Sequence, residues 1–173
     1  MRGIRPQNTS DLLRRRLASE IMGDIRTLQR KIADLNERIE AEVETSGTTL
    51  TEIFGVGPIL AAKIIGTVGN VVRFPTKANF ASYSGTAPLE ASSGEVVVRH
   101  RLSLAGNRKL NNALHMVAIC QARSDVRGRS YYRKKIAEGK SCKEALRCLK
   151  RRISDAVFKS LMADSQTPSR SAA

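Results

Sequence analysis

The sequence has no tryptophan, few aromatic residues and only three cysteines. Aromatic side chains make up 4% of its 173 residues, so the core must be mainly aliphatic, which the 41% apolar content allows. Cys120, Cys142 and Cys148 fit no zinc-ligand spacing and are odd in number. We therefore expect free thiols in a reducing compartment, not a disulfide framework.

Long apolar runs and clustered acids are also missing. No segment approaches the length of a membrane-spanning helix, and the first residues lack the apolar centre of a signal peptide, so we expect a cytoplasmic protein without membrane contact. The eight carboxylates of residues 51–173 are scattered along the chain. A two-metal nuclease needs three or four grouped acids, so we expect no metal site in this chain.

Positive charge is what the sequence has in excess. The 30 Lys and Arg outnumber the 16 Asp and Glu, which gives a net charge of +14. Residues 1–50 are nearly neutral, with nine basic and eight acidic side chains, whereas residues 51–173 hold 21 basic and eight acidic ones. This asymmetry predicts a neutral arm joined to a basic body that binds a polyanion.

The arm, residues 1–46, has the pattern of a long coiled-coil-like helix. Ile25, Ile32 and Ile39 take one heptad position, and Leu28 and Leu35 take the other. Isoleucine at the first position and leucine at the second favour a two-stranded coiled coil, so we expect a homo-oligomer formed through the arm. A long helix packed on its own domain is the alternative. Ser10 or Asp11 is the expected cap at the start of the helix.

A glycine-rich turn follows in the segment IFGVGP, residues 53–58. We expect a short helix that ends at Gly55 and a second helix that begins at Pro58, which together form a helix-hairpin-helix. Bare backbone N–H groups at the start of a helix can hold a phosphate, so Gly55, Gly57 and Lys63 are candidate nucleic-acid-binding residues. A turn with only a packing role is the alternative. No strand precedes the glycines, which excludes a dinucleotide-binding fold.

The remaining pattern predicts a mainly α fold with one short β segment. We expect a body over residues 47–163 and a disordered tail over residues 164–173. The expected elements are a short helix near 76–83, a strand within 95–102, and helices over 105–123 and 131–139 with a loop over 124–130 between them. A Ser141–Glu144 capping box opens the last helix. We expect Arg147, Lys150 and Arg151 to lie away from the apolar face of that helix.

One segment contains a candidate nucleophile. In EASSGEVVVRHR, Ser92 and Ser93 precede a glycine and are followed by Arg99 and Arg101. A serine can attack a phosphodiester when its hydroxyl is deprotonated and cations hold the phosphate. From the residues alone, ordinary loop composition explains Ser-Ser-Gly better than catalysis does.

Four features occur in one order: the helical arm, the GVGP hairpin, the SSG loop and the GNRxL helix. Together they resemble, over residues 10–163, the C-terminal domain of insertion-sequence transposases of the one-ten type, also called one-sixteen and nine-oh-two. The resemblance implies that Ser93 is the nucleophile, with Ser92 as the alternative. It also implies nucleic-acid contacts from Asn107 and Arg108, with Arg99 and Arg101 beside the serine. Leu104 and Ala105 stand where the family often has basic residues, so one phosphate contact is expected to be lost.

The resemblance also implies a function. Members of the family are RNA-guided DNA recombinases whose N-terminal, RuvC-like nuclease half has four acidic metal ligands. That half is not among these residues, so we expect magnesium to belong to it and no cofactor in this chain. We expect DNA and a structured guide RNA as partners, a role in DNA transposition and no catalysis by this chain alone. Two alternatives stay open: a non-enzymatic helix-hairpin-helix nucleic-acid-binding module, and a structural adaptor that oligomerises through the arm and binds RNA.

Overall fold

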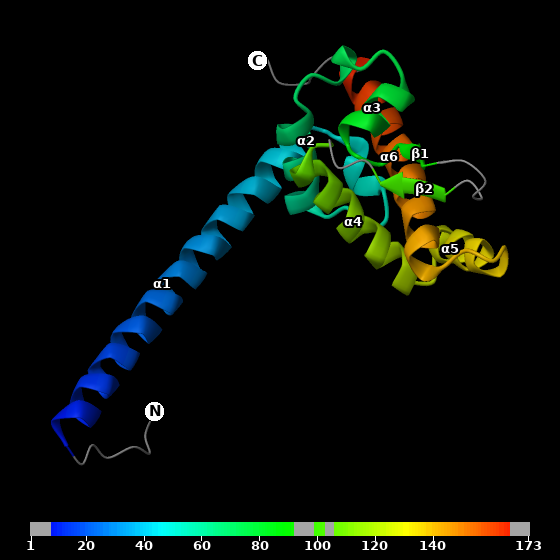
Figure 1. The fold of residues 1–173 in the computed structure, drawn as a ribbon. Coiled ribbons are helices and arrows are strands. Elements are labelled where there is room, and N and C mark those ends of the chain that lie inside the picture. The colour runs from blue at the N-terminus through cyan, green and yellow to red at the C-terminus, as the bar shows by residue number, and fades with distance from the viewer. Residues whose placement is uncertain (1–7, 92–98, 103–105, 167–173) are drawn as a thin grey trace, which may run out of the picture. The chain divides into compact units, whose positions relative to one another are not determined.

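The computed structural model describes residues 8–91, 99–102 and 106–166 and is mainly helical, as predicted (Figure 1). Its elements, in chain order, are α1 (Thr9–Thr45), the short 3₁₀ helix η1 (Thr49–Glu52), α2 (Pro58–Val68), η2 (Val71–Arg73), α3 (Lys77–Tyr83), β1 (Pro88–Ala91), β2 (Arg99–Leu102), α4 (Arg108–Arg123), α5 (Arg127–Ala137) and α6 (Cys142–Gln166). The chain divides into two compact units, residues 1–41 and 42–173.

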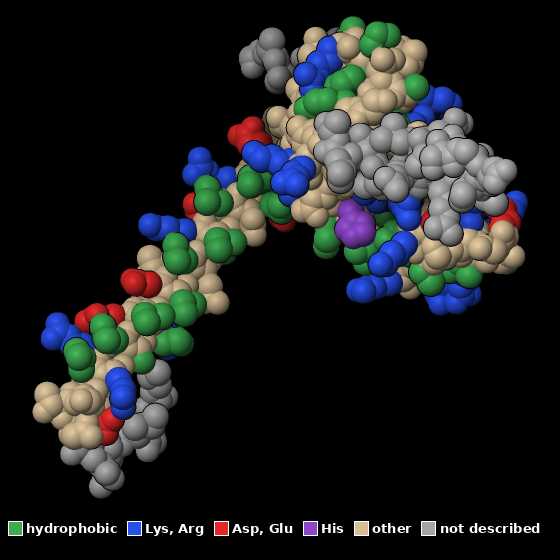
Figure 2. Space-filling view, viewed as in Figure 1, with side chains coloured by type: hydrophobic (Ala, Val, Ile, Leu, Met, Phe, Trp, Pro, Cys, Tyr) green, Lys and Arg blue, Asp and Glu red, His purple; other side chains and the backbone are tan. Residues whose placement is uncertain are grey.

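The first unit is the larger part of α1. The side-chain oxygen of Asn8 accepts a hydrogen bond from the backbone N–H of Asp11 at 2.8 Å, so the cap precedes the predicted Ser10 or Asp11. None of residues 8–41 is buried, and Leu28 and Ile32 of the heptad pattern are each 57% exposed. Figure 2 shows the hydrophobic side chains along this helix.

The second unit is a helical body built around α6. This helix packs against α3, α4, α5, η1 and η2. The core is largely aliphatic, as the composition predicted, and its largest fully buried apolar side chains are Phe80, Leu50, Ile64, Leu110, Leu114, Val68, Val117 and Val157. Phe80 lies at its centre, with ring centroids 5.4 Å from Phe74 and 5.5 Å from Phe158.

The two ends of the body are joined by Asp164. Its carboxylate accepts hydrogen bonds from the Thr48 hydroxyl at 2.7 Å and from the Thr49 hydroxyl at 2.7 Å and backbone N–H at 3.1 Å. The disordered tail was predicted to start at this residue, but α6 continues to Gln166. The end of α6 therefore fixes the start of η1, which leads into the glycine-rich turn.

The predicted loop over residues 124–130 is partly wrong, because α5 begins at Arg127. Gly128 is buried, and a Cβ atom there would lie 2.4 Å from the Gln121 side-chain oxygen. The glycine thus allows close packing of α5 on α4, and it does not form a turn. The capping box is confirmed: the Ser141 backbone N–H and hydroxyl both donate to the Glu144 carboxylate, at 2.9 and 2.7 Å.

The β segment is an antiparallel pair. β1 and β2 pair with Glu90 opposite His100 and Ala91 opposite Arg99. The predicted strand over 95–102 is confirmed only in its second half, since residues 95–98 lie outside the described part. β1 was not predicted, because its proline and its turn-rich surroundings gave no alternating pattern.

Candidate nucleic-acid interface

The glycine-rich turn joins η1 to α2, and its two glycines differ. Gly55 has a φ of +90°, and a Cβ atom there would lie 3.3 Å from the Cys120 Cβ and 3.5 Å from Val117. Gly57 is the N-cap of α2, with a φ of −82° and a ψ of 172°, and a Cβ atom there would meet nothing within 4 Å. Only Gly55 is therefore required by backbone conformation and packing.

Gly57 leaves the start of α2 open to solvent. The first N–H groups of a helix have no partner within it, and Pro58 at the first position removes one of them. Lys63 is exposed on the same helix. This arrangement is compatible with the predicted binding of a phosphate at the start of α2.

The turn is held firmly by α4. The Gln121 side-chain amide donates to the Phe54 carbonyl oxygen at 2.8 Å, next to the contact of Gly55 with Cys120. Because α2 also packs on α4, the turn and the helix after it share one support. A phosphate at Gly57 would meet a backbone that is already in place.

Asn107 begins α4 and has a structural role. Its side-chain oxygen accepts from the backbone N–H groups of Lys109 and Leu110 at 3.0 and 3.1 Å, and its amide donates to the Tyr83 hydroxyl at 3.0 Å. Its backbone N–H donates to the Tyr83 carbonyl at 2.7 Å. The Asn107 side chain thus caps α4 and contacts the end of α3, and its predicted contact with nucleic acid stays a prediction. Its neighbour Arg108 is exposed.

The adjacent Gly106 allows two backbones to approach closely. A Cβ atom there would lie 2.4 Å from both the Cα and the backbone nitrogen of Gly85. Gly85 itself has a φ of +66°. The Gly-Asn-Arg sequence therefore locks the start of α4 against the turn that leads to β1.

Lys150 is a charged residue of α6 whose burial was not predicted from the sequence. It was placed away from the apolar face of α6, yet it is only 5% exposed. Its spacing of three from Ile153 and seven from Val157 would have placed it on the apolar face. Its ammonium group donates to the Asn111 side-chain oxygen at 2.7 Å. Burial lowers the pKa of Lys150.

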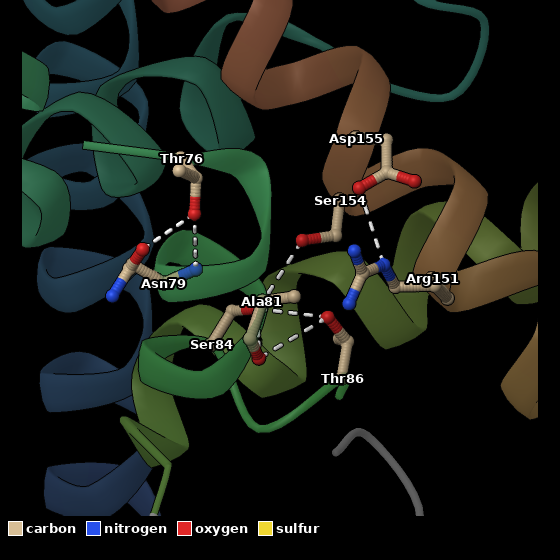
Figure 3. Close-up of polar contacts among 8 residues, drawn as sticks. All are labelled: Thr76, Asn79, Ala81, Ser84, Thr86, Arg151, Ser154 and Asp155. Carbon is tan, nitrogen blue, oxygen red and sulfur yellow. Dashed lines mark hydrogen bonds and ion pairs between the residues drawn. The ribbon is translucent and has the colours of Figure 1, made fainter. Parts of the chain in front are cut away.

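Asn111 links Lys150 to the turn before β1. Its amide donates to the carbonyl oxygens of Ser84 and Gly85 at 2.8 and 3.0 Å. The Ser84 hydroxyl in turn lies 2.9 Å from that of Thr86 and 3.2 Å from that of Ser154 (Figure 3). This buried network fixes the turn against α4 and α6, and β1 leaves from it.

The segment with the candidate nucleophile lies between β1 and β2. Ser92 and Ser93 fall outside the described residues, so their predicted role stays a prediction. Arg99 and Arg101 belong to β2, and the register places Arg99 opposite Ala91, directly before Ser92 in the sequence. Thus the register pairs one predicted arginine position with the last described residue before the serine segment.

Two further properties bear on function. Within the described part of the chain, no three His, Cys, Asp or Glu side chains are grouped so that they could hold a metal ion. None of the helices in that part combines the length and apolarity needed to cross a bilayer.

Comparison with known proteins places these features in a family. Residues 47–133 match the model of the transposase IS116/IS110/IS902 family, a stretch that begins just before η1 and ends within α5. The chain is 37% identical over 123 residues to the insertion element IS110 uncharacterized 43.6 kDa protein of Streptomyces coelicolor. The aligned residues are 70% of this chain and 30% of that protein.

Two further relatives agree. The insertion element IS900 uncharacterized 42 kDa protein of Mycobacterium paratuberculosis is 29% identical over 140 residues, covering 79% of this chain and 34% of that protein. A probable family 20 transposase of Pseudomonas aeruginosa is 28% identical over 120 residues, covering 65% and 36% respectively. The chain spans about a third of the length of these relatives. With its hairpin, its β pair and its Gly-Asn-Arg helix in one matched stretch, this chain belongs to the IS116/IS110/IS902 transposase family.

Proposed function

We propose that this chain is the DNA-binding, serine-bearing portion of an insertion-sequence transposase and that it acts in DNA transposition. The observation that carries the proposal is the single family match over residues 47–133, which includes the hairpin, the Ser92–Ser93 segment and the start of α4. The net charge of +14 supports a polyanionic partner. The first test is binding of the full chain to duplex DNA over a range of salt concentrations.

The expected result is sequence-independent binding that weakens as salt rises. Each neutralised phosphate contributes about −0.9 to the slope of log affinity against log salt, so six contacts give a slope near −5. Two DNA duplexes of unrelated sequence should bind within a few-fold of each other. Affinity that does not change with salt would remove the phosphate backbone as the ligand.

The hairpin contributes to this binding through the open start of α2. Gly57→Val places a branched side chain over that surface, and the backbone angles of Gly57 suit valine, so the turn should keep its conformation. Gly66→Val is the matched control, because Gly66 lies in α2, the helix that Gly57 precedes, and a Cβ atom there also meets nothing within 4 Å. We expect weaker binding only for Gly57→Val, with equal circular dichroism spectra. Equal affinities would assign the turn a packing role.

For the chemical step, Ser93 attacks a DNA phosphodiester when the nuclease portion, its magnesium and a structured guide RNA are supplied. The Ser93 oxygen forms a bond to phosphorus, the 3′ or 5′ oxygen of the cut strand leaves, and the serine proton passes to a base outside this chain. Arg99 and Arg101 offset the charge on the transferring phosphate. On a denaturing gel, Ser93→Ala should abolish the covalent serine–DNA adduct and Ser92→Ala should retain it.

The opposite result would assign the nucleophile to Ser92. An adduct in both variants would exclude this segment. If the reconstituted mixture binds DNA but forms no adduct with the wild-type chain, the non-enzymatic helix-hairpin-helix module is the better description.

A further inference from the structure

The basic side chains of the body are concentrated in a different part of the sequence from the glycine-rich turn. Residues 47–83, which contain that turn and α2, hold three Lys and Arg and one Glu. One of the three, Arg73, has its guanidinium 4.6 Å from the centre of the Phe74 ring and 4.7 Å from that of Tyr83. In contrast, residues 127–152 hold 11 Lys and Arg and two Glu. Figure 2 shows Lys and Arg side chains gathered around the end of the body that contains α5.

The two acids in this region are already committed. Glu138 pairs with Lys135 at 2.5 Å, and Glu144 accepts the capping hydrogen bonds of Ser141. The next acid along α6, Asp155, pairs with Arg151 at 3.1 Å. Glu138 also interacts electrostatically with Lys134 and Lys140, but these three acids offset only part of the charge of the 11 Lys and Arg. Six exposed cations belong to α5, to α6 and to the link between them, and we call this set the α5–α6 basic surface: Arg127, Arg133, Lys134, Lys140, Lys143 and Arg152.

This surface carries an energetic penalty in the free protein. Like charges stand four residues apart on α5 at Arg129 and Arg133. Such pairs destabilise a helix, and a net charge of one sign repels itself. A solvated protein face normally mixes both signs, so a surface of this kind indicates a ligand that supplies the missing negative charge.

The cations are also held at defined positions. The Arg152 guanidinium of α6 lies 4.4 Å from the centre of the Tyr131 ring of α5, which joins the two helices. Gly139, with a φ of +86°, closes α5, and the capping box opens α6 directly after it. Five of the six cations therefore stand on two packed helices, and Lys140 lies in the short link between them, so the backbone that carries them loses little freedom when they bind a ligand.

The same residues favour a duplex over other polyanions. A single strand binds by stacking its bases on aromatic rings, but residues 127–152 contain only Tyr131 and Tyr132, and Arg152 already lies over the Tyr131 ring. An anionic membrane surface would require a broad apolar face beside the cations. In the described part of residues 127–152, Ile136 is the one large aliphatic side chain that is exposed, at 37%.

On the basis of the proposed function, we propose that the α5–α6 basic surface is the main phosphate-binding surface of this chain for double-helical DNA. The glycine-rich turn then adds a smaller contact. The long, exposed Lys and Arg side chains contact phosphates of the backbone and do not select a base sequence.

The test compares three full-length variants by fluorescence anisotropy with a labelled 24-base-pair DNA duplex. The first is Arg133→Gln/Lys134→Gln/Lys143→Gln. The second, Arg133→Lys/Lys134→Arg/Lys143→Arg, keeps the charge at the same positions. The third, Arg15→Gln/Arg26→Gln/Lys31→Gln, removes three exposed cations from α1. Circular dichroism checks that each variant keeps the helical content of the wild type.

We expect the first variant to bind at least about tenfold more weakly near 0.1 M salt and to flatten the slope of log affinity against log salt by about 2.7, or 0.9 for each lost contact. The charge-keeping and α1 variants should stay within about twofold of the wild type. The inference is overturned if the first variant binds like the wild type, or if the α1 variant loses as much affinity. It is also overturned if an RNA stem of equal length binds at least tenfold more tightly than the DNA.

The two levels of the proposal fail in different ways. A wild-type chain without salt-dependent DNA binding removes the proposed function and this inference together. A wild-type chain that binds DNA, with affinity lost in Gly57→Val but kept in the first variant, removes this inference alone and assigns the contact to the turn.

Discussion

The α1 helix and the helices of the body use the same apolar residues with opposite results. In the body, Leu110 and Leu114 of α4 are completely buried. In α1, Leu28 and Ile32 follow an equally regular spacing, and each is 57% exposed. The periodicity of a helix shows which face is apolar, but it does not show what covers that face. The difference between the two regions is therefore a difference in partners, and it can be tested.

The largest expected effect is in the body core. Leu114→Ala removes a completely buried side chain and should lower the free energy of unfolding by about 2–5 kcal/mol. The matched change in the arm, Leu28→Ala, should alter it by no more than about 0.5 kcal/mol. Urea denaturation at a protein concentration that keeps the chain monomeric measures both values. Equal losses would show that the apolar face of α1 is covered within a single chain.

A second pair of substitutions compares two glycines. Gly106→Ala forces a methyl group against the Gly85 backbone, where a Cβ atom would lie only 2.4 Å away, and should destabilise the body by about 1–3 kcal/mol. Gly23→Ala, inside α1 with open space around it, should stabilise the helix by about 0.5–1 kcal/mol. Thermal unfolding followed by circular dichroism gives both signs. A tolerated Gly106→Ala would mean that the turn before β1 can move.

The third prediction asks what covers the arm. We infer that a second copy of the chain does, because isoleucine and leucine alternate in the pattern of a two-stranded coiled coil. Ile32→Asp would then bury an unpaired charge in the seam and should convert the oligomer to a monomer, while the body stays folded. Ile32→Leu is the control and should keep the oligomer. Analytical ultracentrifugation decides: equal masses for wild type and Ile32→Asp would exclude the seam as an interface.

Local patterns predicted much of the fold. The heptads of α1, the capping box at Ser141 and the short helix over 77–83 all depend on neighbouring residues, and the structure contains each of them. What failed depended on distant contacts. Gly128 was taken as part of a loop because glycine disfavours helices, but it packs against Gln121 of another helix. β1 exists only because β2 pairs with it, which no local pattern could indicate.

The sequence predicted where the motifs of the candidate site lie better than it predicted what their side chains contact. Gly55 and Gly57 were correctly placed at a turn, yet only Gly55 needs glycine for its backbone conformation. The capping role of the Asn107 side chain was not predicted, and its contact with nucleic acid stays a prediction. Lys150 was expected away from the apolar face of α6, because charged residues are almost never buried without a partner and its partner Asn111 is 39 residues away. Side-chain roles follow from such long-range contacts.

The smallest expected effect concerns His115, which lies on α4 near Lys150. Burial, and to a lesser extent the positive charge of Lys150, lowers the pKa of His115 below its usual 6.5. Between the lowered folded value and 6.5, the unfolded chain binds more protons at this site than the folded chain does. Stability from His115 is therefore complete above pH 6.5 and is lost as the pH falls through the lowered pKa.

His115→Gln should accordingly flatten the pH dependence of unfolding below pH 6.5 and leave it unchanged above. The chain has two histidines, and His100 is present in both proteins, so the difference between their curves isolates His115. Urea midpoints measured from pH 5 to pH 8 give the comparison. If the variant instead loses stability equally across that range, His115 contributes through packing, and its titration does not affect the free energy of unfolding. A steeper loss for the variant at low pH would reverse the sign and show that the protonated form is favoured in the folded body.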